Sequence, residues 1–303
     1  MNWPSSIKGF RAYLLLERSL SEHSIDAYLR DVGKLQEFVE LTGMDKNPDE
    51  MIYEDFQDFL IYLNTLGLGD RSQARILSGL KAFYKYLLME DLIKDDPTDL
   101  LEGPKLKRKV PDVLSYEEVV SLLDAVDLSE ETGHRNRAML ETLYACGLRV
   151  SELINLKLSN YYPDIEYVKV LGKNNKERIV PISQDAIKHN EIYINSYRNK
   201  LNIHPDFEDH LYLNRRGKAL SRVMIFTIIK NLAEKLGMSK KVSPHTFRHS
   251  FATHLVEGGA DLRAVQDMLG HDSILTTEIY THLDQSYLRD TLLKYHPRNV
   301  NKN

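Results

Sequence analysis

The segment 243–249 (SPHTFRH) combines residue types that can bind a phosphate and move a proton. Ser243 is a typical N-cap residue and proline is common in the first turn, so a helix is predicted to begin here. Helix N-termini favour anions, because they carry free N–H groups and a positive partial charge. His245, Arg248 and His249 follow at this end; an arginine can hold two phosphate oxygens, and a histidine can transfer a proton near neutral pH. The segment is equally compatible with a capped core helix that carries a surface histidine and arginine.

Arg149 is a second candidate for phosphate binding. It follows a helix that Gly147 ends and precedes a second apolar helix, SELINL. Its apolar neighbours predict substantial burial, and a buried arginine requires an anionic partner. That partner is either a carboxylate such as Glu152 or the phosphate of a substrate.

Lys173 is predicted to lie at the tip of a β-hairpin. Two alternating segments, 165–171 and 178–182, flank the sequence Gly-Lys-Asn-Asn, and glycine and asparagine tolerate the positive φ angles of tight turns. A lysine at such a tip is ordinarily solvated, and it takes part in chemistry only if the hairpin folds over a site.

The segment 270–282 contains His271 and Tyr280. A tyrosine is neutral at pH 7, and ionising it costs about 4 kcal/mol because its pKa is near 10. A nucleophilic tyrosine therefore needs neighbouring cations and a base, which the arginines, the lysine and the histidines could supply. Considered alone, Tyr280 is more typical of a core residue.

No metal site or other cofactor is expected. His245 and His254 lie on opposite sides of the predicted helix, and neither an HExxH motif nor a glycine-rich phosphate loop is present. Cys146 is the single cysteine, which excludes an intramolecular disulfide and a cysteine-based zinc site.

Two groups of elements must position these residues. Residues 1–102 are predicted to be a helical bundle, with a third helix that begins at Pro48, and their many aromatic residues are interpreted as core. Residues 112–303 mix helices with the hairpin and a further short strand at 211–213, before a helical C-terminal part. The predicted fold class is mainly α with small β elements.

Residues 103–111 (GPKLKRKVP) are predicted to be a linker, because proline and glycine stop regular structure. The segment is the densest basic run of the chain and contains Lys105, Lys107, Arg108 and Lys109. It is either a solvated hinge or a strap that follows a phosphate backbone.

The composition is that of a globular protein of about two domains, with 303 residues, 42% hydrophobic and 28% charged. No signal peptide and no apolar run of ~18 residues is present, so a cytoplasmic protein without a membrane span is expected. The net charge of −4 weakly disfavours nucleic acid. However, residues 1–100 contain 11 basic and 18 acidic residues, whereas the remainder contains 29 and 26. We therefore expect a basic groove on the second domain and the linker.

Together these residues resemble the tyrosine recombinase (phage integrase-like) family. The order Arg149, Lys173, His245-x-x-Arg248, His271, Tyr280 is similar to the complete catalytic set of that family. The surrounding strings also match, and they include TLYACGLRVSELINL, LGKNNKERIVPI, SPHTFRHSFATHLVEGGADLRAVQDMLGH and TTEIYTH. The resemblance covers almost the whole chain and is strongest to the Xer branch.

The resemblance implies a fold, a reaction and a role for each residue. Residues 1–102 would be a core-binding (SAM-like) DNA-binding domain, and residues 112–303 a mixed α+β catalytic domain that ends in a protomer-docking helix. Tyr280 would attack a DNA phosphodiester and form a 3′-phosphotyrosyl link, without metal or cofactor. Arg149 and Arg248 would hold the phosphate oxygens, and His271 would hydrogen-bond the phosphate. His245 would assist proton transfer, and Lys173 would protonate the leaving 5′ oxygen.

The implied partner is duplex DNA, on which a homo- or hetero-tetramer acts at two sites. A paralogous recombinase and a DNA translocase that activates cleavage are further expected partners, and resolution of chromosome dimers at cell division is the expected role. Three alternatives stay open: an integrase of a mobile element, a type IB-like topoisomerase, and a DNA-binding module without enzymatic activity.

Overall fold

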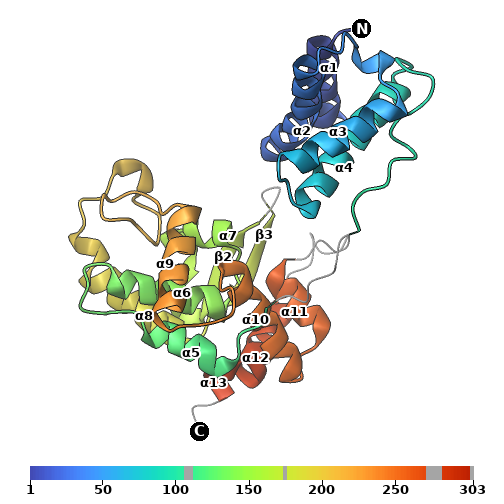
Figure 1. The fold of residues 1–303 in the computed structure, drawn as a ribbon. Helices are drawn as coiled ribbons and strands as arrows, with labels where there is room; N and C mark the ends of the chain where they lie inside the picture. The colour runs from blue at the N-terminus through green and yellow to red at the C-terminus, as the bar shows by residue number, and fades with distance from the viewer. Residues whose placement is uncertain (106–111, 173–175, 271–281, 301–303) are drawn as a thin grey trace. The chain divides into compact units, whose positions relative to one another are not determined.

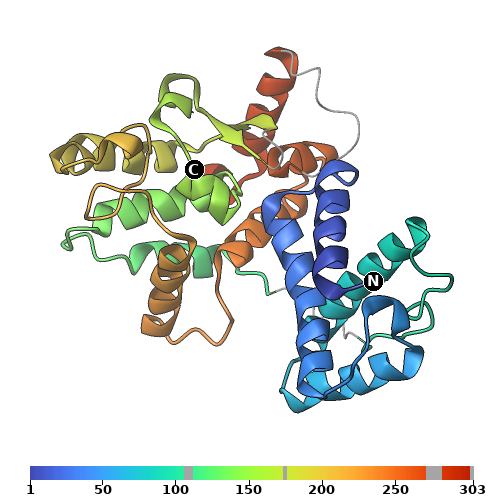
Figure 2. The same cartoon turned by 90° about the horizontal axis from the view of Figure 1, so that it is seen from above.

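The computed structural model describes residues 1–105, 112–172, 176–270 and 282–300. The chain divides into two compact units, Met1–Lys109 and Val110–Asn303, here called the N-terminal and the C-terminal unit. In the described ranges the regular elements of the N-terminal unit are all helices, and the three-stranded sheet belongs to the C-terminal unit (Figures 1 and 2). The predicted class, mainly helical with small β elements, is therefore confirmed. The predicted boundaries at 102 and 112 stay a prediction.

In its described residues the N-terminal unit has four α-helices and a short 3-10 turn. They are α1 (Trp3–Leu16), α2 (Glu22–Leu41), η1 (Pro48–Glu50), α3 (Tyr53–Thr65) and α4 (Asp70–Met89). As predicted, the Ser21 side chain caps α2, where it accepts from the Ser24 N–H. The third helix does not begin at Pro48, because the Asp55 carboxylate accepts from the Ile52 N–H and starts α3 there.

Aromatic side chains fill the core of the N-terminal unit, as predicted. Phe10, Phe56, Phe59, Phe83 and Tyr84 are fully buried. Burying a side chain of this size contributes roughly 1.5–3 kcal/mol, so these five rings carry much of the stability of the bundle.

The C-terminal unit begins with three helices, α5 (Tyr116–Asp124), α6 (Gly133–Ala145) and α7 (Val150–Ile154). A small antiparallel sheet follows, with β1 (Tyr161–Tyr162), β2 (Tyr167–Leu171) and β3 (Glu177–Pro181) in that order. Val168 pairs with Val180 and Leu171 with Glu177, which is the register of the predicted hairpin. The remaining helices are α8 (Gln184–Ser196), α9 (Arg222–Lys235), α10 (Pro244–Glu257), α11 (Leu262–Leu269), α12 (His282–Tyr295) and α13 (Pro297–Val300).

The expected strand at 211–213 is wrong. Leu213 forms only an isolated bridge with Ala219. The Leu211 N–H donates to the Leu156 carbonyl, beside a second isolated bridge between Lys157 and His210, and the Leu213 N–H donates to the Tyr193 hydroxyl.

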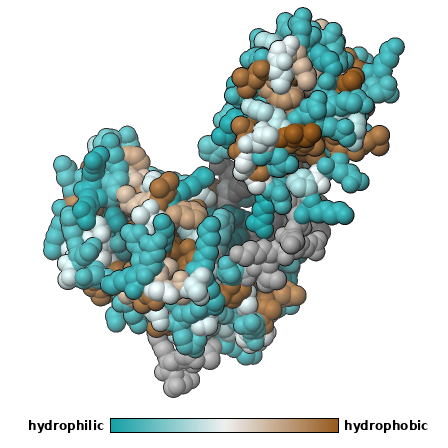
Figure 3. Space-filling model, viewed as in Figure 1, coloured by the Kyte–Doolittle hydropathy of each residue, from teal (hydrophilic) through white to brown (hydrophobic). Residues whose placement is uncertain are grey.

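α6 is the central helix of the C-terminal unit and packs against α8 and α10, while α11 and α12 lie against β3. Hydrophilic side chains cover most of the face of each unit seen in Figure 3. No helix in the described ranges is long and apolar enough to cross a membrane.

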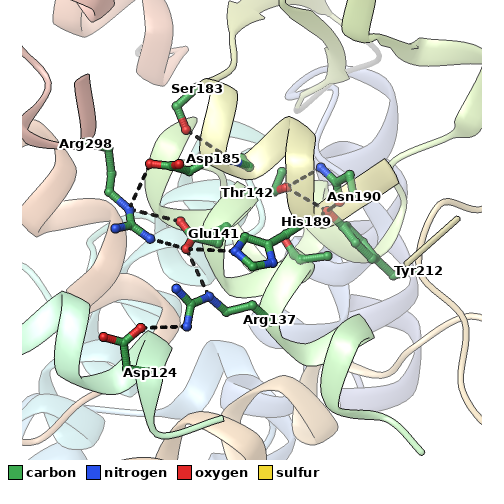
Figure 4. Close-up of polar contacts among 12 residues, drawn as sticks. Asp124, Arg137, Glu141, Thr142, Ser183, Asp185, His189, Asn190, Tyr212 and Arg298 are labelled. Carbon is green, nitrogen blue, oxygen red and sulfur yellow. Dashed lines mark hydrogen bonds and ion pairs between the residues drawn. The ribbon is translucent and has the colours of Figure 1, made fainter. Parts of the chain in front are cut away.

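A cluster of charged side chains holds the C-terminal segment onto the C-terminal unit of the same chain. We call it the Glu141 cluster (Figure 4), and it consists of Asp124, Arg137, Glu141, Asp185, His189 and Arg298. Glu141, on α6, is fully buried; Arg137 and Arg298 both donate to it. The contact with Arg298 fastens α13 to α6.

Candidate active site

The helix predicted at Ser243 is present as α10. The Ser243 side chain caps it by accepting from the Thr246 N–H, and Pro244 occupies the first turn. Phe247, Phe251 and Leu255 are fully buried and anchor one side of the helix, as predicted from their spacing. Arg248 lies on the adjoining side, with its side chain 11% exposed.

The turn between α6 and α7 brings Arg149 beside Arg248. Gly147 adopts φ +57°, and a methyl group there would lie 2.4 Å from a ring carbon of Phe251. Only glycine fits this close approach in the left-handed region. The Gly147 carbonyl then accepts from Arg248 Nη1 at 2.7 Å, which ties α10 to the turn that carries Arg149.

Glu152, on α7, is the centre of a four-residue group that we call the arginine cluster: Arg149, Glu152, Arg178 and Arg248. The Glu152 carboxylate is buried and accepts from the Arg149 backbone N–H and from Arg149 Nη1, each at 2.8 Å. Arg178 donates both Nη groups to it, at 2.8 and 2.9 Å, and Arg248 Nη1 lies 3.8 Å away. Of the two partners predicted for Arg149, the structure shows the carboxylate, Glu152.

The end of α11 completes the cluster. Its last carbonyls have no partner within the helix, and each accepts from a different arginine. Met268 accepts from Arg178 Nε at 2.9 Å, Leu269 from Arg248 Nη2 at 2.6 Å, and Gly270 from Arg149 Nη2 at 3.1 Å. The negative end of the helix dipole favours these cations.

The arginine cluster has three cations and one carboxylate. Burial raises the pKa of Glu152, but hydrogen bonds and charge from Arg178 and then Arg149 outweigh it, so the pKa is lowered overall. Burial, with the positive charge of Arg149, lowers the pKa of Arg248 to about 10, which leaves it charged at neutral pH. The cluster therefore holds an excess of positive charge.

Both proposed phosphate ligands keep donors for a substrate. Arg248 uses two of its five N–H groups and Arg149 likewise uses two within the described part of the chain. Arg149 is less buried than predicted, with 38% of its side chain exposed, so it is open to a ligand. Arg149 and Arg248 can therefore both donate hydrogen bonds to one bound oxyanion.

The structure describes some of the other predicted site residues. His245 is exposed in the first turn of α10, three residues before Arg248, and His249 is exposed beside it. Lys173, His271 and Tyr280 lie outside the described residues, but Gly172 and Gly270, which directly precede two of them, lie against the arginine cluster. In the linker Lys105 is exposed, and Lys107, Arg108 and Lys109 also lie outside the described residues.

Reasoning from the sequence did not identify Arg178, and it named Glu152 only as one of two alternative partners of Arg149. The sequence did contain a signal for Arg178. Successive side chains of a strand point to opposite faces, so Arg178 shares its face of β3 with the buried Val180 and points towards the core. Within the described residues, no group of three or more His, Cys, Asp or Glu side chains could hold a metal ion.

Comparisons with known proteins identify the family. The model of the phage integrase family matches residues 112–286, and that of the phage integrase N-terminal SAM-like domain matches residues 7–91. The chain is 44% identical to tyrosine recombinase XerD of Staphylococcus saprophyticus, over 96% of this chain and 98% of the relative. It is 42% identical to tyrosine recombinase XerD of Chlorobaculum tepidum, over 98% and 97%.

Solved structures share the fold. The crystal structure of XerA recombinase is 32% identical, with a TM-score of 0.50, and the match covers 97% of this chain and 99% of that one. XerH site-specific recombinase bound to a palindromic difH substrate is 22% identical, with a TM-score of 0.68 and coverage of 91% and 81%. The arginine cluster lies within residues 112–286, which the model of the phage integrase family matches. The chain therefore belongs to the phage integrase family, as a site-specific recombinase of the tyrosine type.

Proposed function

We propose that this chain cuts and rejoins duplex DNA at a specific site, with Tyr280 as the nucleophile. The tyrosine oxygen forms a bond to phosphorus and the 5′ oxygen leaves, which produces a 3′-phosphotyrosyl link and a free 5′-hydroxyl. The tyrosine proton passes to His245, and Lys173 protonates the leaving oxygen. The covalent link conserves the phosphoester bond, so the reverse attack by a partner strand rejoins the DNA without an energy source.

The excess positive charge of the arginine cluster carries this proposal. A phosphodiester has one negative charge, and a second develops as the tyrosine oxygen attacks. In this proposal Arg149 and Arg248 supply oriented hydrogen-bond donors and uncompensated positive charge beside these two negative charges. In this proposal His271, which follows Gly270 in the sequence, adds a hydrogen bond to the same phosphate; the Gly270 carbonyl accepts from Arg149.

For the cellular role, we propose the resolution of chromosome dimers at cell division. The support is that relatives named XerD are 40–44% identical over nearly the full chain. Integrases of the Tn1549 transposon are about 20% identical and share the fold alone, so they give no support to a mobile-element role. A tetramer on two DNA sites, a paralogous recombinase, an activating translocase and a cytoplasmic location belong to the same proposal.

The test begins with the DNA site. Fragments of the source genome that the purified chain protects from nuclease are sequenced, and a site opposite the replication origin is expected. A duplex with this site and a nick just downstream of the cleavage position then traps the covalent intermediate, because the short 5′-hydroxyl strand diffuses away.

Wild-type chain should form an adduct that survives a denaturing gel, and Tyr280→Phe should form none. Equal adduct from Tyr280→Phe, or none from wild type, overturns the mechanism. Relaxation of supercoiled DNA without paired sites would instead favour a topoisomerase, and a protected site inside a mobile element would favour an integrase.

A further inference from the structure

Arg178 lies in the arginine cluster, but binding of a substrate phosphate does not explain its position there. It lies on β3, is 6% exposed, and donates all three kinds of guanidinium N–H to the protein: both Nη groups to Glu152 and Nε to the Met268 carbonyl. With its fork occupied by Glu152 and its Nε by the backbone, it is unsuited to grip a substrate phosphate as Arg149 and Arg248 can. Its contacts are with other parts of the site.

These contacts connect three segments, each next to a residue proposed for the reaction. Through Glu152, Arg178 is tied to the backbone and side chain of Arg149. A methyl group on Gly172 would lie 3.6 Å from Arg178 Nη1, so the side chain passes the base of the hairpin that continues to Lys173. A methyl group on Gly270 would lie 3.1 Å from Arg178 Cδ, Nε and Nη1, at the residue before His271.

The three segments are distant in the sequence. Arg178 is 26 residues from Glu152 and 90 from Met268. Two of the segments also end at an abrupt local feature, since α7 begins directly after Arg149 and Gly270 ends α11 in a left-handed conformation with φ +63°. Without Arg178, no other described side chain bonds to both Glu152 and the Met268 carbonyl.

We propose that Arg178 is a positioning residue for DNA cleavage. It fixes the positions of Arg149, the hairpin base and the end of α11 relative to one another, so that the groups that bind and attack the phosphate meet at the correct distances. Glu152 transmits this effect to Arg149. The role rests on the proposed function and adds to it a residue that does not touch the DNA.

Lysine cannot replace Arg178 in this role. A lysine carries the same charge, but a single ammonium cannot form two parallel bonds to Glu152 and also donate sideways to Met268. A displacement of about 1 Å at a reacting group can slow a reaction roughly 100-fold. Arg178→Lys should therefore keep the charge of the site and lose its geometry.

The test separates binding from cleavage. DNA affinity is measured by gel shift, and the rate of adduct formation is measured in a single turnover at saturating nicked duplex, with melting temperature as the check on folding. We expect Arg178→Lys to bind DNA within about threefold of wild type and to cleave roughly 100-fold more slowly.

Arg198→Lys is the matched control. Arg198 is 4% exposed in the same unit, and its guanidinium donates to the carbonyls of Glu208 and His210, away from the arginine cluster. It should lower the melting temperature to a similar extent and leave the cleavage rate within about threefold of wild type. A second variant, Arg178→Gln with Glu152→Gln, removes both buried charges together and avoids an orphaned carboxylate.

Cleavage by either folded Arg178 variant within about threefold of Arg198→Lys overturns the positioning role, as does an equal loss of rate in the control. A defect confined to DNA affinity also overturns it. If wild type itself forms no adduct, the proposed function fails and this role fails with it; a wild-type adduct together with normal cleavage by Arg178→Lys refutes only the role of Arg178.

Discussion

The Glu141 cluster and the arginine cluster are both built around a buried carboxylate that binds arginines, but their charges differ. In the Glu141 cluster Arg137 and Arg298 face three carboxylates, from Asp124, Glu141 and Asp185. In the arginine cluster three guanidiniums share Glu152. The Asp124 side chain is 62% exposed, so the more buried part of the Glu141 cluster has two guanidiniums and two carboxylates. A structural cluster balances its buried charges in this way, because an uncompensated buried charge is costly. The excess positive charge beside Glu152 is therefore a sign of a site prepared for an anion.

The largest expected difference comes from replacing one arginine in each cluster. Arg248 and Arg137 are almost equally exposed, with side chains 11% and 12% accessible. Arg248→Lys should slow adduct formation roughly 100- to 1000-fold, because one ammonium cannot replace the planar fork beside the developing charge. Arg137→Lys should cleave at close to the wild-type rate. Equal rates in the single-turnover assay would break the distinction between the clusters.

Replacing each central carboxylate by its amide sharpens the comparison. Glu141→Gln and Glu152→Gln should each lower the free energy of unfolding by about 3 kcal/mol, because each leaves buried arginines uncompensated. Only Glu152→Gln should also slow cleavage, since Glu152 orients Arg149. Urea denaturation and the adduct assay measure the two effects. If Glu141→Gln, destabilised to the same extent, cleaved as slowly as Glu152→Gln, the loss of stability alone would account for the slower reaction.

The two clusters should also respond to different pH ranges. Burial, and then the charge of Arg137, lowers the pKa of His189 to about 4, so the folded chain keeps it neutral while the unfolded chain protonates it below about pH 6.5. Its contribution to stability is present above pH 6.5 and is lost as the pH falls towards 4. Glu152, with a lowered pKa, contributes above about pH 4.3 and loses its contribution only below that.

The unfolding free energy of wild type should therefore fall between pH 6.5 and 4, and His189→Gln should reduce this slope by up to about one proton. Glu152→Gln should leave the same slope unchanged and flatten the curve only at lower pH. An unchanged slope in His189→Gln would mean that this histidine gains its proton over the same pH range in the folded and the unfolded chain.

The smallest expected effect separates backbone strain from contact with Arg178. Gly237 and Gly270 both have φ +63°, but a methyl group would meet nothing within 4 Å at Gly237 and would lie 3.1 Å from Arg178 at Gly270. Alanine at either position should cost about 1 kcal/mol from the left-handed backbone. Gly270→Ala should in addition displace Arg178 and slow adduct formation, whereas Gly237→Ala should not. Identical cleavage rates would argue against contact between Arg178 and the end of α11 during the reaction.

Local signals in the sequence predicted much of the fold. Ser21 and Ser243 were recognised as helix caps, and the stripe through Phe247 and Phe251 was recognised as core, because caps and helical faces depend on residues within four positions. The predicted start of the third helix at Pro48 and the predicted strand at 211–213 are wrong. Asp55 and partners distant in the chain accept the backbone hydrogen bonds that decide these two structures.

The candidate site was predicted less completely. Arg149 and Arg248 were chosen from their types and neighbours, and the structure brings both to Glu152. Arg178 was missed, because an arginine in an alternating strand is ordinarily read as an outward, solvated residue. The roles of Lys173, His245, His271 and Tyr280 stay predictions.

The sequence by itself determined which residues can bind a phosphate and where each local element begins, because those properties depend on side-chain chemistry and near neighbours. Only the tertiary structure decided which of them meet. Arg248 donates to Gly147 across 101 residues and Arg149 to Gly270 across 121. Such contacts exist only once the helices and the sheet have packed, and packing sums many small contacts that no short pattern records. The excess of charge beside Glu152 is a product of that packing, and the net charge of −4 did not reveal it.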